Sequence, residues 1–509
     1  MAIRHYVLLA TDGFINLPTT KALCPLPVTR QEVYIFGFVG GLFRVTENDC
    51  ITYENKSLDW TDSDNFQYLK ELTSTASIPS PILWADVGDR LYITLINLGM
   101  PVSGLNDPHT IHLHGAHVAT QLDGFPETSF GVPMWMDYTS PPPAVTYYFM
   151  PENPGTYMYH CHVEASEHVQ MGMYGALVIY PSERSLAIAG ITMDKKGWWQ
   201  LHGETQHQIP RYASHRSFAY NHINAFFDKE YVMLLSDIDL KWHQTVQTTV
   251  QTGIAFNAST FKPDFWLVNG RAFPDTLLPH PQTPNSDENE NLMQINYESY
   301  VHIATDQKFL LRMINMGYQV VPWHIHGWHF NIIGKDAHVS PFLKIASILD
   351  VHDHDVMDMG FTVTIGSGET YDLLLTADDK RPTYSNYIFK GQDGFPSLCS
   401  QMKALDQLDQ GLIENIPTEP VTCGQVNTVN YVELCDTCDF FPQFYPMHNH
   451  DDYKVTNTNT LENPNFSEYP GGQLTFIQAD APLCDNLNHH CSCNCDNHDE
   501  DNEQNGDDN

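Results

Sequence analysis

The chain has 509 residues, of which 42% are hydrophobic and 12% aromatic, so it is long enough for two or three domains with sizeable cores. Its 31 glycines and 32 prolines are near average, which excludes collagen and low-complexity disorder for the chain as a whole. Lys and Arg number 25 against 62 Asp and Glu, which gives a net charge of −37. Because phosphate backbones repel so acidic a chain, we expect no nucleic-acid partner.

The sequence also bears on membranes and on thiol chemistry. No apolar run approaches the roughly 18 residues of a membrane span, so we expect no membrane segment. The first ten residues hold only a short apolar patch and read as the edge of a strand, not as a secretory leader. The 11 cysteines are an odd number, so at least one thiol must be unpaired or bound to metal.

The local patterns, taken in chain order, predict mainly strands. Short alternating apolar runs bounded by Gly, Pro, Asn and Asp are typical of strands, and the clearest are residues 90–97, 174–180, 308–315 and 371–376. Short helices are indicated only at residues 66–73 and 401–410. Many short strands with regular turns favour sandwiches or barrels, so the predicted fold class is all-β.

Composition divides the chain into four parts. A first unit covers residues 1–185, a polar connector 186–228, and a second unit 229–480. Residues 481–509 form an acidic tail without apolar pattern, for which disorder is the default prediction. The tail also contains cysteines and histidines, so metal capture is its alternative interpretation.

Two histidine patterns occur twice along the chain. Residues 109–115 (His-Thr-Ile-His-Leu-His-Gly) and 321–327 (Val-Pro-Trp-His-Ile-His-Gly) both end in His-x-His-Gly. Residues 159–162 (Tyr-His-Cys-His) and 447–450 (Met-His-Asn-His) each hold a later His-x-His. One such pair is weak evidence in a chain with 26 histidines, and the pair at 352–354 is interpreted as a solvated loop. Four pairs at matching places indicate an internal repeat.

Strand geometry predicts which face each of these side chains occupies, because alternate residues of a strand point to opposite faces. His160 and His162 would share one face, and Cys161 would take the other. His109 precedes the first pair by an odd number of residues and would therefore join Cys161.

The second repeat has metal-donor residues on only one of these two faces. Val321 stands where His109 stood, and Asn449 stands where Cys161 stood. The two repeats together supply eight imidazoles, which are His112, His114, His160, His162, His324, His326, His448 and His450.

These residue types point to copper. One thiolate, two imidazoles and a more distant Met form the ligand set of a blue-copper electron-transfer site. Cys161, His168 and Met173 lie on one loop, His109 comes from a neighbouring strand, and Met171 is the competing axial ligand. Eight imidazoles without carboxylate suit a cluster of copper ions. Two of them flank the cysteine, which therefore offers a covalent path from the single copper to the cluster.

These segments resemble the multicopper oxidases, the laccase and ceruloplasmin superfamily, and most closely their small two-domain laccase-like members with the type 1 copper in the first domain. The resemblance covers nearly all of residues 1–480, including 36–41, 366–370 and 469–472. It implies two cupredoxin-like Greek-key β-sandwich domains and four coppers per chain: one type 1, one type 2 and a type 3 pair. The spacing from Cys161 to His168 is longer than in three-domain laccases.

The resemblance implies a role for each ligand. The type 1 copper would be held by His109, Cys161, His168 and Met173. The type 2 copper would be held by His112 and His324. The type 3 pair would be held by His114, His160, His162, His326, His448 and His450.

Other polar residues have two interpretations each. Asp123 stands at the spacing of a family acid that orients water and protons, and alternatively is the turn-forming Asp of an Asp-Gly pair. Glu164 and Glu167 either relay protons or face solvent. Three further histidines without partner motifs are expected in packing or at the surface: His117, His329 and His338. Four cysteines suggest disulfide bonding more than redox or zinc chemistry: Cys399, Cys423, Cys435 and Cys438.

The implied function is oxidation of a reducing substrate (a phenol, an aromatic amine or a metal ion) with reduction of dioxygen to water. The resemblance implies a homotrimer with the cluster between subunits, and a cluster within one chain is the alternative. Copper nitrite reductase is the enzymatic rival, but it would have Asp at His112 and a non-ligand at His162. A copper-sequestering protein without turnover is the rival of another class. A periplasmic or extracellular location, with the leader absent from this chain, is expected, and the cytoplasm is the alternative.

Overall fold

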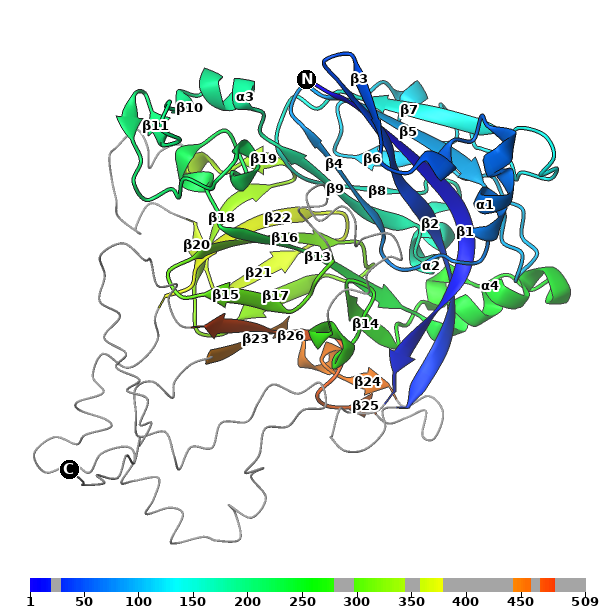
Figure 1. Ribbon diagram of the computed structural model, residues 1–509. Coiled ribbons are helices and arrows are strands. Elements are labelled where there is room, and N and C mark those ends of the chain that lie inside the picture. Colours follow the sequence, from blue (N-terminus) through cyan, green and yellow to red (C-terminus); the bar gives the residue numbers. More distant parts are fainter. Residues whose placement is uncertain (20–28, 279–296, 344–357, 379–442, 459–466, 481–509) are drawn as a thin grey trace, which may run out of the picture.

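The computed structural model describes residues 1–19, 29–278, 297–343, 358–378, 443–458 and 467–480. Strands dominate these ranges and form two β-sandwiches that pack against each other, so the predicted all-β class with two sandwiches is confirmed (Figure 1). The expected helix at 401–410 lies outside the described residues, as do the acidic tail and the pair at 352–354.

The first sandwich consists of a five-stranded and a four-stranded sheet. The larger sheet has the order β3-β2-β1-β5-β7 and contains β1 Ile3–Pro18, β2 Arg30–Glu47, β3 Cys50–Tyr53, β5 Arg90–Asn97 and β7 Ala144–Phe149. The smaller sheet has the order β4-β9-β8-β6 and contains β4 Ser80–Asp86, β6 His112–His114, β8 Gly155–His160 and β9 Tyr174–Tyr180. Two helices, α1 Phe66–Glu71 and α2 Ala165–Met171, complete it. The predicted bounds of β5 and β9 are confirmed, and α1 falls in the predicted helix.

The second sandwich repeats this plan. Its seven-stranded sheet contains β13 Lys229–Ile238, β14 Phe265–Val268, β16 Lys308–Asn315, β18 Phe330–Lys335, β19 His338–Val339, β20 Met359–Gly360 and β22 Thr370–Thr376. Its five-stranded sheet contains β15 Val301–Ala304, β17 Val321–Ile325, β21 Thr362–Ile365, β23 Gln443–Asn449 and β26 Leu474–Asp480. A small pair, β24 Asn457–Thr458 and β25 Ser467–Glu468, flanks it. A helix, α4 Leu240–Thr252, follows β13 and packs against β2 of the first sandwich. The predicted bounds of β16 are confirmed, and β22 begins one residue earlier than predicted.

The buried apolar side chains of the two sandwiches form three hydrophobic cores. One core lies inside each sandwich, and the third lies between them. In β1, Val7 and Leu9 enter the shared core while Leu8 enters the core of the first sandwich. In β13, Val232 likewise enters the shared core while Met233 enters the core of the second. Both strands are therefore buried on both faces, which explains their continuous apolar runs.

The segment between the sandwiches carries a small folded unit that its polar composition does not predict. It contains α3 Glu183–Ile188 and the three-stranded sheet β10 Ile191–Met193, β11 Trp199–Leu201 and β12 Glu204–Thr205. Its scattered aromatic and aliphatic residues form a core of their own, in which the ring centroids of Trp199 and Phe218 are 4.9 Å apart.

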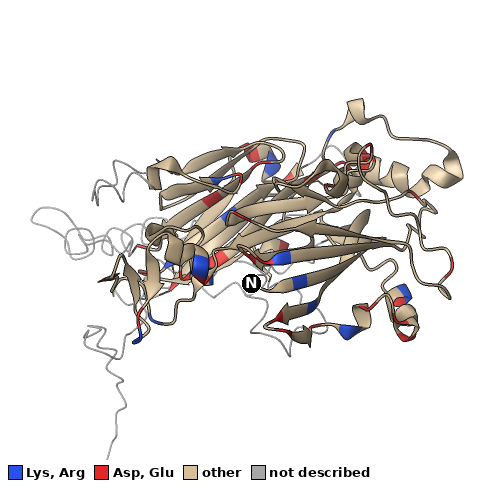
Figure 2. Cartoon of the chain, turned by 90° about the horizontal axis from the view of Figure 1, so that it is seen from above, with Lys and Arg blue, Asp and Glu red and all other residues tan. Residues whose placement is uncertain are grey.

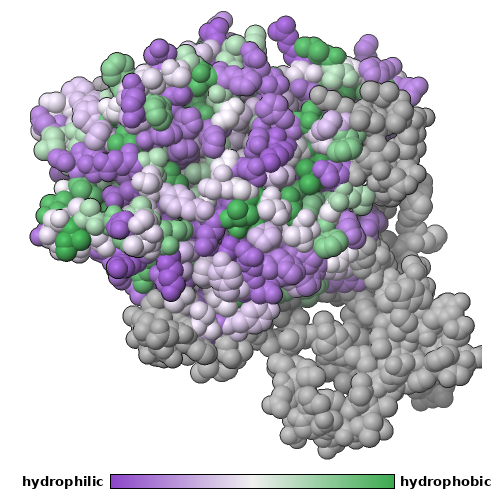
Figure 3. All heavy atoms as spheres, turned by 180° about the vertical axis from the view of Figure 1, so that it is seen from behind, coloured by the Kyte–Doolittle hydropathy of each residue, from purple (hydrophilic) through white to green (hydrophobic). Residues whose placement is uncertain are grey.

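The distribution of charged residues agrees with this burial pattern. Most of the strand ribbon carries neither acidic nor basic residues in Figure 2. On the rear face, the hydrophobic residues form small separate groups among hydrophilic ones (Figure 3). No helix within the described ranges is long and apolar enough to cross a membrane.

A buried ionic network joins both sandwiches and the connector. Arg312 on β16 is fully buried, and its Nε donates to Oε2 of Glu230 at 2.7 Å. One of its terminal nitrogens donates to Oγ1 of Thr156 on β8 at 3.1 Å, and Thr156 in turn donates to Asp372 on β22 at 2.5 Å. The Tyr220 hydroxyl of the connector also donates to Asp372 at 2.5 Å. One cation thus compensates two buried carboxylates and holds β8 against the second sandwich.

Replacing this cation should strongly destabilise the fold. Arg312→Met leaves Glu230 and Asp372 buried without a counter-charge, which should cost about 3–5 kcal/mol of unfolding free energy. Arg30→Met is the matched control, because the Arg30 side chain is 39% exposed in its ion pair with Asp275 and should contribute at most about 1 kcal/mol. Urea denaturation measures both changes. Equal losses in the two variants would contradict the importance of the buried network.

Candidate metal centre

The thiol of Cys161 lies between two buried imidazoles. β8 ends at His160, so Cys161 is the first residue after the strand. Its Sγ is 3.8 Å from Nδ1 of His109 and 3.4 Å from Nδ1 of His168. One donor atom from each of the three residues lies within 4.8 Å of the others, and all three side chains are 0% exposed. His109 pairs with Val132 in an isolated bridge that precedes β6, so it comes from a separate segment, although not from the regular strand that the sequence suggests.

The loop that carries His168 closes through the backbone of Met173. Helix α2 is followed directly by Gly172, whose φ of 116° favours glycine. The N–H of Met173 then donates to the carbonyl of His168, and the N–H of Cys161 donates to the carbonyl of Met173, both at 3.0 Å. Met171 and Met173 are both fully buried in the core that also contains Cys161, so both candidate axial ligands remain open.

Burial controls the protonation of these donors. Desolvation lowers the pKa of His168 to about 4 and that of His109 well below its usual value, where the neighbouring His168 adds to the effect. Burial raises the pKa of Cys161 to about 11. The metal-free site therefore holds two neutral imidazoles and a protonated thiol near neutral pH, and a bound metal ion would displace that one proton.

The first imidazole quartet lies on the opposite side of β8. His112 on β6 is directly opposite His160 in the antiparallel register, and His162 packs edge-on against His112 with ring centroids 5.1 Å apart. Nδ1 of His112 donates to the carbonyl of Asp123 at 2.6 Å, and Nδ1 of His160 donates to the carbonyl of Cys161 at 2.8 Å. Because a carbonyl only accepts, these nitrogens carry the protons, and Nε2 of each ring stays free to bind a metal.

The second quartet repeats this arrangement residue for residue. His324 on β17 is directly opposite His448 on β23. Nδ1 of His324 donates to the carbonyl of Phe361 at 2.7 Å, and Nδ1 of His448 donates to the carbonyl of Asn449 at 2.9 Å. The Nε2 atoms of His326 and His448 are 3.1 Å apart, within hydrogen-bond distance, so the outer nitrogens of these two rings converge. His324, His326 and His448 are also the residues of this half whose donor atoms lie within 4.8 Å of one another.

The two positions on the reverse side of the second quartet that match His109 and Cys161 carry no metal donor. Val321 is buried where the first repeat has His109, and Asn449 is fully buried where it has Cys161. Nδ2 of Asn449 donates to Gln473 at 2.7 Å, and Oδ1 accepts from the backbone N–H of Asp451 at 2.9 Å. The amide is thus satisfied by hydrogen bonds and acts as a structural residue.

The two quartets are separate within one chain. Every ring contact between two of the eight quartet histidines joins members of the same quartet. Figure 1 places β6 and β8 well apart from β17 and β23. Exposed apolar side chains adjoin both quartets: Phe125 packs edge-on against His162, and Phe361 packs edge-on against His324.

The acidic residues predicted near the site are placed as follows. Oδ1 of Asp123 accepts from the N–H of Phe125 at 3.0 Å, which is the turn-forming interaction, while its carbonyl holds His112. Glu164 is exposed and Glu167 half-buried, and both have a carboxylate oxygen within 4.8 Å of a nitrogen of His168. Burial raises the pKa of Glu167, and the charge of Glu164 raises it further.

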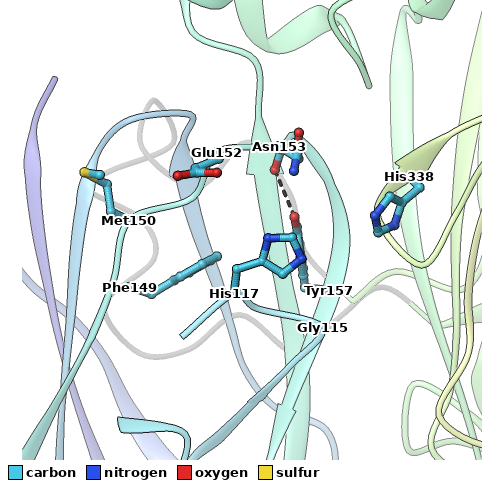
Figure 4. Close-up of a pocket in the computed structure, with 8 residues that line it drawn as sticks. All are labelled: Gly115, His117, Phe149, Met150, Glu152, Asn153, Tyr157 and His338. Atoms are coloured by element: carbon cyan, nitrogen blue, oxygen red, sulfur yellow. Dashed lines mark hydrogen bonds between the residues drawn. The ribbon is translucent and has the colours of Figure 1, made fainter. Parts of the chain in front are cut away.

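The histidines without partner motifs lie at the surface, as expected. His117, His329 and His338 are all exposed. His117 and His338 line a small hollow beside Gly115, the residue that follows the first His-x-His pair (Figure 4). The four cysteines between 399 and 438 lie outside the described residues. The structure describes two free cysteines, Cys161 and the exposed Cys50.

The buried imidazoles predict acid sensitivity of the metal-free protein. Because the folded state lowers the pKa of His168 from 6.5 to about 4, the unfolded chain takes up its proton first. The stability that His168 contributes is complete above pH 6.5 and is lost as the pH falls toward 4. Between pH 7 and pH 4.5, the unfolding free energy of His168→Gln should therefore fall by about 2 kcal/mol less than that of the wild type, as measured by urea denaturation. The exposed His117→Gln is the control, and an identical pH dependence in all three proteins would contradict the interpretation.

Part of the chain is similar in sequence to known proteins. Residues 52–183, which include the thiol site and the first quartet, match the multicopper oxidase family model. Copper resistance protein A of Escherichia coli is 32% identical over 108 residues, which are 21% of this chain and 15% of that protein. Its homologue in Pseudomonas syringae pv. tomato is 33% identical over 112 residues, which are 22% of this chain and 17% of that protein.

The match therefore spans only about a sixth of the length of these curated relatives. Among solved structures, the blue copper oxidase of Nitrosomonas europaea aligns with 93% of this chain and 85% of its own, at 19% identity and a TM-score of 0.48. The family match and the matching relatives agree with what the histidine motifs of the first unit predict: residues 52–183 are similar to a multicopper oxidase domain.

Proposed function

We propose that this protein is a laccase-like multicopper oxidase that takes single electrons from a small reducing substrate and reduces dioxygen to water. The observation that carries the proposal is the arrangement around β8, where a buried thiol with two imidazoles backs directly onto an imidazole quartet. Such a pairing suits a one-electron acceptor joined to a multi-electron site.

The ligand assignment follows the sequence motifs. The type 1 copper takes His109, Cys161, His168 and Met173. The type 2 copper takes His112 and His324. The type 3 pair takes His114, His160, His162, His326, His448 and His450. Four copper ions per chain supply the one-electron redox chemistry.

The protein side chains orient the donors and keep the site dry. The carbonyl partners of His112 and His160 fix the tautomer of each ring, so that Nε2 is the metal-binding atom. Burial keeps the thiol-side imidazoles neutral and able to bind a metal. Cys161 joins both sites through its own backbone and that of His160 and His162, which is the shortest covalent route for an electron. Each dioxygen requires four electrons and four protons and yields two waters.

Asp123 has two roles in this proposal. Its carbonyl positions His112, and its carboxylate is the acid proposed to orient water and protons beside the cluster. The carboxylate is already engaged by the N–H of Phe125 through one oxygen, which leaves the other oxygen for a proton or a water.

We propose further that the protein is a homotrimer with the cluster between subunits. Each chain carries two quartets that do not contact one another, and each quartet has exposed apolar neighbours in Phe125 or Phe361. A head-to-tail contact that joins the first quartet of one chain to the second quartet of the next closes a ring. Location in the periplasm or outside the cell goes with this proposal.

Copper content and activity test the assignment of the thiol site. The wild type should bind four coppers per chain, show a blue absorption and consume oxygen with a simple phenol. Cys161→Ser should retain three coppers, lose the blue band and lose at least about 99% of its oxygen uptake, because the electron path is cut. Unchanged activity would refute the path. Copper binding without turnover in the wild type would favour the sequestering protein, and nitrite reduction would favour nitrite reductase.

Subunit complementation tests the position of the cluster. His112→Ala removes a ligand from the first quartet and His324→Ala one from the second, so each variant alone should be inactive. When the two are unfolded, mixed equally and refolded, about a quarter of the interfaces of a ring should combine two intact quartets and restore that share of activity. A cluster within one chain predicts no recovery. The assembly should have three times the 57.9 kDa mass of the chain in light scattering.

A further inference from the structure

Helix α2 carries His168 but is too short to hold its own position. It has seven residues, and its N-cap residue Glu164 has a left-handed φ of 42° and makes no side-chain capping bond. Isolated helices shorter than about 12 residues are marginal in water. The position of His168 relative to the thiol of Cys161 therefore depends on the residues that contact the helix from outside.

The end of α2 is bound to the second sandwich. Gln170 is buried, and its side-chain Nε2 donates to the backbone carbonyl of Asp237 at 2.7 Å. Asp237 is the last residue but one of β13. The bond lies two residues after His168, so it connects the thiol-site loop of the first sandwich to a strand of the second.

The first turn of α2 is held by Tyr318, which lies in the loop between β16 and β17. The Tyr318 hydroxyl donates to the carbonyl of Ser166 at 2.6 Å and lies 3.3 Å from the carbonyl of Ala165. Because His168 lies between Ser166 and Gln170 in the helix, it is held between two contacts with the second sandwich.

The loop that carries Tyr318 is itself fixed. The backbone N–H of Gln319 donates to Oδ2 of Asp237, and the N–H of Gly317 donates to Oδ1 of Asn315, both at 3.0 Å. A Cβ at Gly317 would lie 2.7 Å from Oδ2 of Asp237, so a larger residue would push the loop away. Asp237 thus anchors both contacts with α2, one through its carbonyl and the other through its carboxylate.

A third contact fixes the strand beneath α2. His243 on α4 is fully buried, and its Nδ1 donates to the carbonyl of Tyr34 on β2 at 2.6 Å. The same strand provides Phe36, whose ring packs edge-on against His168 with the centroids 5.8 Å apart. Helix α4 therefore holds the strand against which the imidazole of His168 packs.

We propose that the second sandwich positions His168 against the thiol of Cys161. The positioning residues are Gln170, His243 and Tyr318. This inference rests on the proposed function, in which His168 is a ligand of the type 1 copper. Residues that orient a ligand from outside tune the geometry and the redox potential of a metal site, so these contacts set the properties of a copper that none of the three residues touches.

The positioning has a redox consequence. Cu(II) prefers tetragonal coordination, whereas a blue-copper site holds two imidazoles and a thiolate in a trigonal arrangement. A less constrained imidazole lets the site relax toward the geometry that Cu(II) prefers, which stabilises the oxidised state. Loss of a positioning contact should therefore slow the reduction of the copper.

Hydrogen exchange tests the positioning without copper. Tyr318→Phe removes the hydroxyl and keeps the ring, so the backbone amides of α2 in the metal-free protein should exchange at least about tenfold faster than in the wild type. Tyr231→Phe is the matched control, because the Tyr231 hydroxyl also donates to a carbonyl, that of His302 at 2.8 Å, near the other end of β13 from Asp237. Equal exchange of α2 in the two variants would overturn the proposal.

Spectroscopy of the copper-loaded protein separates positioning from a purely structural role. Tyr318→Phe should retain four coppers per chain, shift the blue absorption maximum, and slow anaerobic bleaching by a simple phenol at least about threefold. Tyr231→Phe should keep the wild-type band and rate. His243→Gln retains a donor for the Tyr34 carbonyl and should preserve the band better than His243→Leu.

The outcomes distinguish this inference from the proposed function. A lower urea midpoint with an unchanged blue band in Tyr318→Phe would show that the contact only stabilises the fold, and would overturn the positioning role. A wild type without copper at the thiol would overturn the proposed function, and the exchange of α2 in the metal-free protein would still decide whether the second sandwich holds the helix.

Discussion

The pleat of one short strand is the constraint on which the site depends. In β8 and the two residues that follow it, successive side chains alternate between faces. His160 joins the first quartet on one side, and Cys161 joins His109 and His168 on the other. A shift of one residue in the pairing of β8 would exchange these faces and separate both sets of donors. Register is thus as essential to the chemistry as the identity of the ligands.

The structure fixes this register from several directions. β8 pairs with β6 and β9, and Thr156 at its beginning belongs to the buried network around Arg312. The strand that ends in the thiol is therefore anchored in the second sandwich as well as the first. The second sandwich keeps the same strand pairing at His324 and His448, but it fills the reverse side with a valine and a hydrogen-bonded asparagine. One scaffold serves as two different halves because only the inward residues differ.

Much of the site follows from sequence because its signals are local. His-x-His spacing on a strand determines a shared face, and the duplicated motif identifies both quartets without any coordinates. Strands such as β5, β9 and β16 have the predicted bounds because turn residues flank their apolar runs. The family match lies in the first half alone, so the second quartet rests on the internal repeat and on its geometry.

The features that sequence could not predict depend on contacts between distant residues. The pairing of Arg312 with Glu230 and Thr156 joins residues 82 and 156 positions apart, and no local pattern marks it. The core of the connector is formed by aromatics scattered through a polar segment, which conceals their periodicity. The closure of the thiol site and the approach of Glu164 and Glu167 to His168 depend on how α2 folds within a loop of unusual length.

Crystallographic location of copper by anomalous scattering at its absorption edge tests the central claim most directly. We expect one copper beside Cys161, His109 and His168 in each chain, and a group of three coppers where a first quartet meets a second quartet. Copper absent from the thiol, or bound at either quartet without the other, would contradict the account.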